Sequence, residues 1–203
     1  EGAAEELDLD GTIDATARNA GWLDLKMRPE RHNAIKLLLF IDIGGSMDEH
    51  IRVCEELFSA AKAEFKHFEH FYFHNCLYDR VWKDNRRRWQ ETTPTREVLH
   101  KYPADYRVIF VGDASMSPLE LLEPGGSIEG WNEESGLIWL QRVLATWPRT
   151  VWLNPAEREY WNYTPTIQHI KRSFGERMFP LTLAGISEAI EALKKPQPAP
   201  MPA

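Results

Sequence analysis

The sequence predicts an α/β fold with a doubly wound, mostly parallel central sheet, flanked by helices and bordered by one antiparallel edge strand. The continuous apolar run "IKLLLFI" at residues 35–41 is typical of a central parallel strand covered on both faces, and "RVIFVGD" at 107–113 indicates a second buried strand. Further strand and helix patterns alternate along the rest of the chain. Such alternation favours a sheet whose crossover helices lie on both faces.

The individual elements follow from local patterns. After the first strand, one helical stripe is predicted from apolar residues at steps of three and four: Ile51, Cys54, Phe58, Ala61 and Phe65. Residues 70–74 and 77–82, joined through Asn75, indicate a hairpin or two adjacent edge strands. We then expect a helix at 93–102, a strand at 107–113, a helix at 134–147, a strand at 150–154, a helix at 164–174, a strand at 177–182 and a helix at 185–195.

The length and composition indicate one domain with two appendages. A chain of 203 residues that is 43% hydrophobic can bury one well-filled core, which we expect at residues 33–195. In residues 1–32 the stretch "WLDLKM" alternates apolar and polar side chains, so we expect an N-terminal arm packed on the domain. Residues 196–203, "PQPAPMPA", are expected to form a disordered, proline-rich tail.

Charge and cysteine content restrict the classes of partner. The chain has 24 basic and 31 acidic residues and a net charge of −7, which disfavours a general electrostatic grip on nucleic acid. The run Arg86–Arg88 is interpreted as a solvated loop. No apolar stretch approaches the roughly 20 residues that span a bilayer, so no membrane association is expected. Two cysteines are too few for a disulfide scaffold, and a reducing, cytoplasmic compartment is expected.

Two predicted strands end on an acidic residue. Asp42 begins "DIGGSMDEH" after the first apolar run, and Asp113 follows "VIFVG". In doubly wound sheets, ligands bind outside the carboxyl ends of the strands. A desolvated carboxylate is costly on its own, so two that converge favour a bound cation.

Two other roles for these aspartates are less consistent with the sequence. The "DIGGSMDEH" stretch lacks both the GxGxxG and the GxxxxGK[ST] pattern of phosphate-binding loops, and Asp42 would repel an anion. The stretch "DLDGT", residues 8–12, resembles the first motif of haloacid dehalogenase-type phosphatases. It follows the polar "EGAAEEL", whereas that nucleophile should follow a buried strand. A phosphatase acting through Asp8 or Asp42 is therefore kept only as an alternative.

The stretch "DIGGS", residues 42–46, resembles the DxSxS signature of von Willebrand factor A domains, which have a Rossmann-like fold. Asp113 in "VIFVGDAS" stands where that family has its distal aspartate. Thr95 in "TTPTREVL" is the candidate for the threonine of the middle loop, with Thr93 as the second choice. The resemblance implies a metal-ion-dependent adhesion site that holds Mg²⁺, Mn²⁺ or Ca²⁺ and is formed by Asp42, Ser46, Thr95 and Asp113.

Gly44 departs from this pattern. It stands where the signature has its first serine, so one direct hydroxyl ligand is missing and a weaker affinity is expected. Water can fill the position, because Mg²⁺ keeps several waters in protein sites. A position left to water can also accept a carboxylate from a partner, which makes Gly44 a candidate partner-binding residue. A degenerate site without metal is the alternative.

The resemblance is closer for one branch of the family. The stretch before the first strand and "FVGDASMSPLEL" are similar to bacterial proteins with a CoxE-like von Willebrand factor A domain. This similarity implies a protein–protein interaction module, not an enzyme, that works with a MoxR-type AAA+ ATPase or its client in the assembly or maturation of other proteins. A metal-free scaffold of the same fold, binding through loops such as residues 123–136, is the main alternative.

Simpler interpretations exist for several residues. Ser46 and Glu49 match a helix capping box, Thr95 suits a helix start after Pro94, and Asp113 suits a turn at a strand end. A zinc site is disfavoured for His67, His70, His74 and Cys76, because their spacing does not match a CxxC pattern.

The tryptophans fall into two groups. Apolar runs surround Trp139, Trp147 and Trp152, which are expected in the core. Trp131 instead lies in the glycine-rich stretch "EPGGSIEGWNEESG" just after Asp113. Loops at that edge of a sheet often carry recognition, so Trp131 is the candidate partner-facing aromatic residue.

Overall fold

The structure is a computed structural model that describes residues 5–7, 18, 27–29, 33–50, 53–54, 56–57, 59 and 65–196. The chain divides into two compact units, Glu1–Ala34 and Ile35–Ala203. In the first unit, β1 (Glu5–Leu7) pairs antiparallel with β2 (Met27–Pro29). The "WLDLKM" stretch lies outside the described residues except for Met27, and residues 197–203 of the expected tail also lie outside them.

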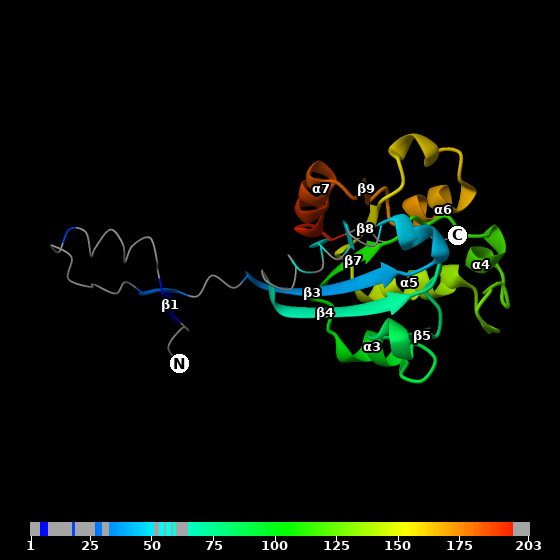
Figure 1. The fold of residues 1–203 in the computed structure, drawn as a ribbon, viewed down its shortest axis with the longest axis horizontal. Helices are drawn as coiled ribbons and strands as arrows, with labels where there is room; N and C mark the ends of the chain where they lie inside the picture. The colour runs from blue at the N-terminus through cyan, green and yellow to red at the C-terminus, as the bar shows by residue number, and fades with distance from the viewer. Residues whose placement is uncertain are drawn as a thin grey trace. The chain divides into compact units, whose positions relative to one another are not determined.

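The second unit contains a five-stranded sheet in the order β4-β3-β7-β8-β9. Its strands are β3 (Asn33–Asp42), β4 (Phe65–Phe73), β7 (Arg107–Val111), β8 (Thr150–Asn154) and β9 (Met178–Pro180). Strands β3, β7, β8 and β9 are parallel to their neighbours. The N–H of Ile43 donates to the carbonyl of Phe73 at 2.9 Å, so β3 and β4 also end at the same edge (Figure 1). The predicted doubly wound α/β fold is confirmed.

Helices cover both faces of this sheet. The α-helices are α3 (Thr95–Lys101), α4 (Pro118–Leu122), α5 (Gly136–Thr146), α6 (Pro165–Ser173) and α7 (Leu183–Leu193). Short 3₁₀ helices are η1 (Gly45–His50), η2 (Asn85–Arg87) and η3 (Arg158–Tyr160). One hydrophobic cluster joins the sheet to α3, α5 and α6, and a second joins it to α7 and η1. Figure 1 shows α3 and α7 on opposite sides of β3.

The apolar run of β3 contributes side chains to both hydrophobic clusters. Leu38 and Phe40 belong to the first cluster, whereas Leu37, Leu39 and Ile41 belong to the second. Successive side chains of a strand point to opposite faces, so a strand covered on both faces needs apolar residues at every position. This burial accounts for the continuous apolar run in the sequence.

Aromatic rings fill the centre of the first cluster. Phe110 stacks on Phe40 at a centroid distance of 4.8 Å and on Trp152 at 5.3 Å, and Phe174 meets its edge at 5.6 Å. The expected burial of the tryptophans is confirmed for all three: Trp139, Trp147 and Trp152.

A short antiparallel element borders β4. Strand β5 (Arg80–Val81) pairs with β6 (Thr93–Pro94) in a separate two-stranded sheet. Tyr72 of β4 forms an antiparallel bridge with Trp82, with N···O distances of 2.7 and 3.2 Å. The expected antiparallel edge is present, although it is shorter than the predicted strand at residues 77–82.

Two local predictions need correction. Phe65 was assigned to the helical stripe, but it is the first residue of β4; the described residues at 53–54, 56–57 and 59 are helical. Helix α4, which has only five residues and begins at a capping box formed by Ser117 and Glu120, was not predicted. In the described part of the chain, no helix has the length and apolar character needed to cross a membrane.

The aromatic stack predicts a large effect of one truncation. Phe110→Ala should lower the free energy of unfolding by about 3–5 kcal/mol, because it removes a fully buried ring and leaves a cavity. Urea denaturation followed by circular dichroism would measure this loss. Ile128→Ala is the control, since Ile128 is 70% exposed and should change stability by less than about 0.5 kcal/mol. Equal effects of the two substitutions would contradict this account of the core.

Candidate metal site at the carboxyl edge of the sheet

The strand order places a topological switch point between β3 and β7. Strand β4, which follows β3 in the chain, lies beside one edge of β3, and β7 lies beside the other edge. Ile41 of β3 is opposite Val111 of β7, so Asp42 and Asp113 follow neighbouring strands at the same edge. Doubly wound sheets bind their ligands in the crevice at this point.

Asp42 is a buried carboxylate whose two oxygens have different surroundings. Its side chain is 2% exposed. Oδ1 accepts hydrogen bonds from the N–H of Gly44 at 2.8 Å and of Asn75 at 2.7 Å. Oδ2 is buried and has no hydrogen-bond partner within the described residues. An unpartnered buried oxygen of this kind costs free energy unless a further group binds it.

The electrostatic surroundings of Asp42 oppose its ionisation. Burial raises the pKa of Asp42 from 3.8 to about 7. The two backbone N–H groups act against this rise, whereas the nearby carboxylates of Asp113 and Glu120 add to it. Negative charge is therefore concentrated at this edge without a compensating cation among these groups, and a bound cation would relieve the cost.

Asp113 is held by the loop that follows β7. Its side chain is 6% exposed, and Oδ1 accepts a hydrogen bond from the N–H of Ser115 at 2.9 Å. Its backbone carbonyl accepts one from Nδ2 of Asn154 at 2.8 Å. The next residue, Ala114, has a φ of 57°, and its carbonyl accepts a bond from the Thr166 hydroxyl at 2.8 Å. The left-handed backbone at a non-glycine residue costs about 1–2 kcal/mol, and these bonds hold it in place.

Sequence reasoning missed Asn75 and Glu120. Asn75 follows β4 with a φ of 54°, and its Nδ2 donates to Oε1 and Oε2 of Glu120 at 3.3 and 3.1 Å. Glu120 is 3% exposed and also accepts from the N–H of Ser117 at 3.2 Å. Asn75 therefore links Asp42 to a third buried carboxylate. The Ser117-x-x-Glu120 capping box was a usable signal for α4, but nothing in the sequence indicated its proximity to β3.

The other predicted ligands, Ser46 and Thr95, lie in positions that are less favourable for binding a cation. Ser46 is exposed within η1, which begins at Gly45, so Ser46 is not the N-cap of this helix. Thr95 is buried at the start of α3, and its hydroxyl donates to the carbonyl of Tyr78 at 2.6 Å. No hydrogen bond in the described part of the chain joins the Thr95 side chain to Asp42 or Asp113. Thr93, the second choice, pairs with Val81 in the small sheet.

The described histidines and cysteines differ in their surroundings. Among the residues that the structure describes, no group of three or more His, Cys, Asp or Glu side chains is placed to hold a metal ion. Cys76 is buried and free, and burial raises the pKa of its thiol. His74 instead faces Glu129 at 3.6 Å. A cation at Asp42 would thus depend on hydroxyl, amide and water oxygens as well as on carboxylates.

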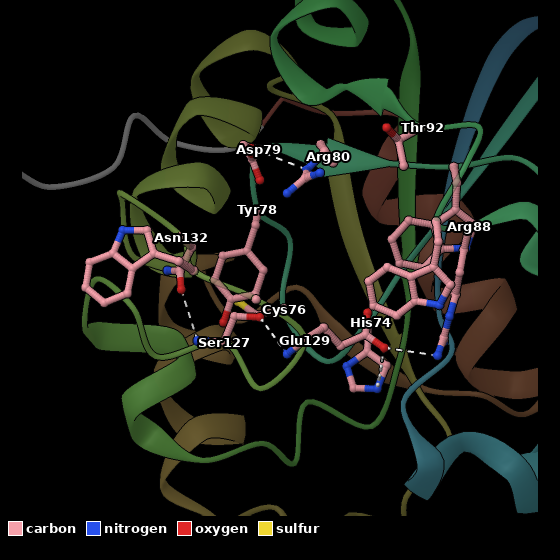
Figure 2. Close-up of a pocket in the computed structure, with 14 residues that line it drawn as sticks. His74, Cys76, Tyr78, Asp79, Arg80, Arg88, Thr92, Ser127, Glu129 and Asn132 are labelled. Atoms are coloured by element: carbon pink, nitrogen blue, oxygen red, sulfur yellow. Dashed lines mark hydrogen bonds and ion pairs between the residues drawn. The ribbon is translucent and has the colours of Figure 1, made fainter.

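The predicted recognition loop lines a cavity that Arg88 also borders. Trp131 is 76% exposed, and its ring lies against Gly125. Together with Trp89 and Arg88 it lines a cavity of about 90 Å³, and Figure 2 shows Arg88 and His74 both directed at Glu129. Arg88 also lines a second cavity of about 610 Å³, which Asp42 and Met47 share. The Asp42 region and the recognition loop are thus connected through Arg88.

No family model, no curated protein and no solved structure matches this chain. The "DLDGT" motif lies outside the described residues, so the structure does not bear on a role for Asp8.

The burial of Asp42 predicts a pH-dependent effect of Asp42→Asn. A folded-state pKa of about 7 against an ordinary 3.8 means that the native state favours the protonated acid. The contribution of Asp42 to the free energy of unfolding is fully present below about pH 4. It falls by about 4 kcal/mol in total as the pH rises through about 7. An amide avoids this loss but leaves a buried N–H₂ unpaired at a cost of about 1–3 kcal/mol. In EDTA at about pH 8, Asp42→Asn should therefore be more stable than the wild type by about 1–3 kcal/mol.

Urea denaturation at about pH 8 and about pH 5 measures this difference, which should vanish or reverse at the lower pH. Glu188→Gln, an exposed acid on α7, is the control and should show no such pH dependence. A wild type that is the more stable protein at both pH values would contradict the interpretation.

Proposed function

We propose that this protein is a binding module in which a divalent cation, Mg²⁺ or Mn²⁺, links the carboxyl edge of the sheet to an acidic residue of a partner protein. The observation that carries the proposal is the buried Oδ2 of Asp42, which lacks a hydrogen-bond partner among the described residues and lies at the switch point near Asp113 and Glu120. Asp42, Asp113 and the exposed hydroxyl of Ser46 would hold the cation, directly or through water.

The donor set supports a hard cation. Carboxylate and hydroxyl oxygens suit Mg²⁺ and Mn²⁺, and Mg²⁺ commonly keeps several waters and one or two carboxylates. The cavity of about 610 Å³ that Asp42 lines has room for such waters. A water position can be replaced by a carboxylate from a partner, which makes the cation a bridge between the two proteins.

The chemistry of the described side chains favours binding over turnover. Catalysis by covalent attack needs a nucleophile paired with a base. Cys76 is fully buried with a raised pKa, and Asp42 has its Oδ1 bound to two backbone N–H groups. Neither has the exposed, activated character of a nucleophile.

The strand-end aspartates also support the resemblance to von Willebrand factor A domains. Asp42 and Asp113 follow adjacent parallel strands, as the proposed adhesion site requires. By that resemblance we propose a bacterial, cytoplasmic protein that works with a MoxR-type AAA+ ATPase or its client. Cys54 and Cys76 are buried and not joined in a disulfide, which is compatible with a reducing compartment.

The partner surface is proposed at the loops beside the cation site. Exposed apolar side chains are uncommon as a group on a surface that faces only water. Trp89, Ile128 and Trp131 are 67%, 70% and 76% exposed. Aromatic residues of this kind often dominate binding energy at interfaces.

A metal-free scaffold of the same fold is the second candidate. It is favoured by the Thr95 hydroxyl, which is already hydrogen-bonded to Tyr78, and by the absence of a side chain at Gly44. In this case the same loops would bind the partner, and chelation would leave binding unchanged.

Calorimetric titration tests the cation site. Mg²⁺ and Mn²⁺ should bind chelator-treated protein saturably, and Asp113→Asn should weaken the affinity by about tenfold or more because it removes one charge and one ligand. Glu188→Gln is the matched control and should bind like the wild type. If the wild type binds neither cation at millimolar concentration, the cation-bridge proposal is wrong and the metal-free scaffold is favoured.

Trp131 should contribute to partner affinity without affecting the cation. Trp131→Ala should weaken binding of a MoxR-type ATPase by about 2 kcal/mol while leaving Mg²⁺ affinity unchanged, since the exposed ring contacts Gly125 and not Asp42. Biolayer interferometry in Mg²⁺ would measure the loss. Tyr163→Ala, which removes a side chain that is 83% exposed, is the control. Unchanged partner binding in Trp131→Ala would exclude this loop as the contact surface.

A further inference from the structure

The side chain of Asn75 occupies the space that a side chain at residue 44 would need. A Cβ atom added to Gly44 would lie 2.0 Å from Oδ1 of Asn75 and 3.3 Å from Oδ1 of Asp42. The backbone of Gly44 is not among the positive-φ glycines, so its conformation does not itself require glycine. The close approach of the Asn75 carbonyl oxygen is the feature that excludes a side chain at residue 44.

Hydrogen bonds fix the orientation of the Asn75 amide. Its Nδ2 donates to both carboxyl oxygens of Glu120, so the amide nitrogen is the atom on that side. Oδ1 is therefore the atom directed at Gly44. The backbone N–H of Asn75 is meanwhile bound to Oδ1 of Asp42, which holds the residue against the start of the Asp-Gly-Gly-Ser turn.

Asp42 is the nearest carboxylate to this place. Its Oδ1 lies beside the same point, and its buried Oδ2, which has no partner within the described residues, lies toward Gly112, where an added Cβ would be 3.2 Å away. An amide carbonyl oxygen is a hard ligand of the type that divalent cations accept from Asn side chains. Asn75 thus brings a neutral oxygen donor to the position where the DxSxS pattern would have a serine.

We propose that Oδ1 of Asn75 is a ligand of the divalent cation and replaces the serine hydroxyl that is missing at Gly44. This inference rests on the proposed cation site and adds a ligand from a different strand, β4. Glycine at residue 44 is then a requirement of the site, because any side chain there would displace the Asn75 oxygen.

The replacement of a serine hydroxyl by Oδ1 of Asn75 can be tested by placing a serine at residue 44. Asn75→Gly removes the amide and keeps a residue that tolerates the φ of 54°. The double variant Gly44→Ser/Asn75→Gly then offers a hydroxyl in the space that the amide has left. Gly44→Ser alone should not help, because its Cβ would meet the Asn75 oxygen at 2.0 Å.

The experiment is a calorimetric titration of Mn²⁺ and Mg²⁺ into the wild type and these three variants, each shown to be folded by circular dichroism. Asn75→Gly should weaken the affinity by about tenfold or more, and the double variant should recover most of that loss. Asn162→Gly, at an exposed loop position, is the control for replacing Asn by Gly and should leave the affinity unchanged.

The outcomes separate this inference from the proposed function. If the wild type binds the cation and Asn75→Gly binds equally well, Asn75 is not a ligand, and the cation site stands without it. If Asn75→Gly loses affinity and the serine does not restore it, Asn75 has a purely structural role and the inference is also overturned. If the wild type binds no cation, both the inference and the cation site fail.

Discussion

The burial of one carboxylate at the end of the central strand is the constraint on which the rest of the site depends. Asp42 is nearly inaccessible, and its Oδ1 is bound by two backbone N–H groups while Oδ2 is left without a partner in the described residues. Burying an acid in this way opposes folding, because water no longer solvates its charge. Proteins tolerate such a cost where function requires it, and a bound cation would remove it.

The sheet produces this burial and also positions the groups around it. Strand β3 lies between β4 and β7 and packs against a hydrophobic cluster on each face, so its final residue, Asp42, is only 2% exposed. The residues after β4 and β7, Asn75 and Ala114, both adopt left-handed backbone conformations. These turns direct the chain back across the carboxyl edge, and they bring Asn75 and Asp113 to the same end of the sheet as Asp42.

The candidate cation site and the candidate recognition surface share structural elements. Asn75 contacts Asp42, while its neighbours His74 and Cys76 line the cavity beside Trp131. Arg88 borders both this cavity and the one that Asp42 lines. A partner that supplied a carboxylate at the cation would therefore lie against the exposed tryptophans of the neighbouring loops, and its affinity would combine a charged contact with apolar burial.

The sequence alone determined the fold class, most of the elements and the two acidic strand ends, because hydrophobic periodicity and strand-end residues are local features. It predicted the strand at 150–154 to the residue, and it identified Asp42, Asp113 and Trp131 as candidates. It misassigned Phe65, since the boundary between a helix and a strand depends on packing, and it missed the short helix α4. Only the tertiary structure brought Asn75 and Glu120 to Asp42 and showed why residue 44 is glycine. The reason is physical: these contacts join residues 33 and 45 positions apart, and they exist only because β4 and α4 fold back against the end of β3.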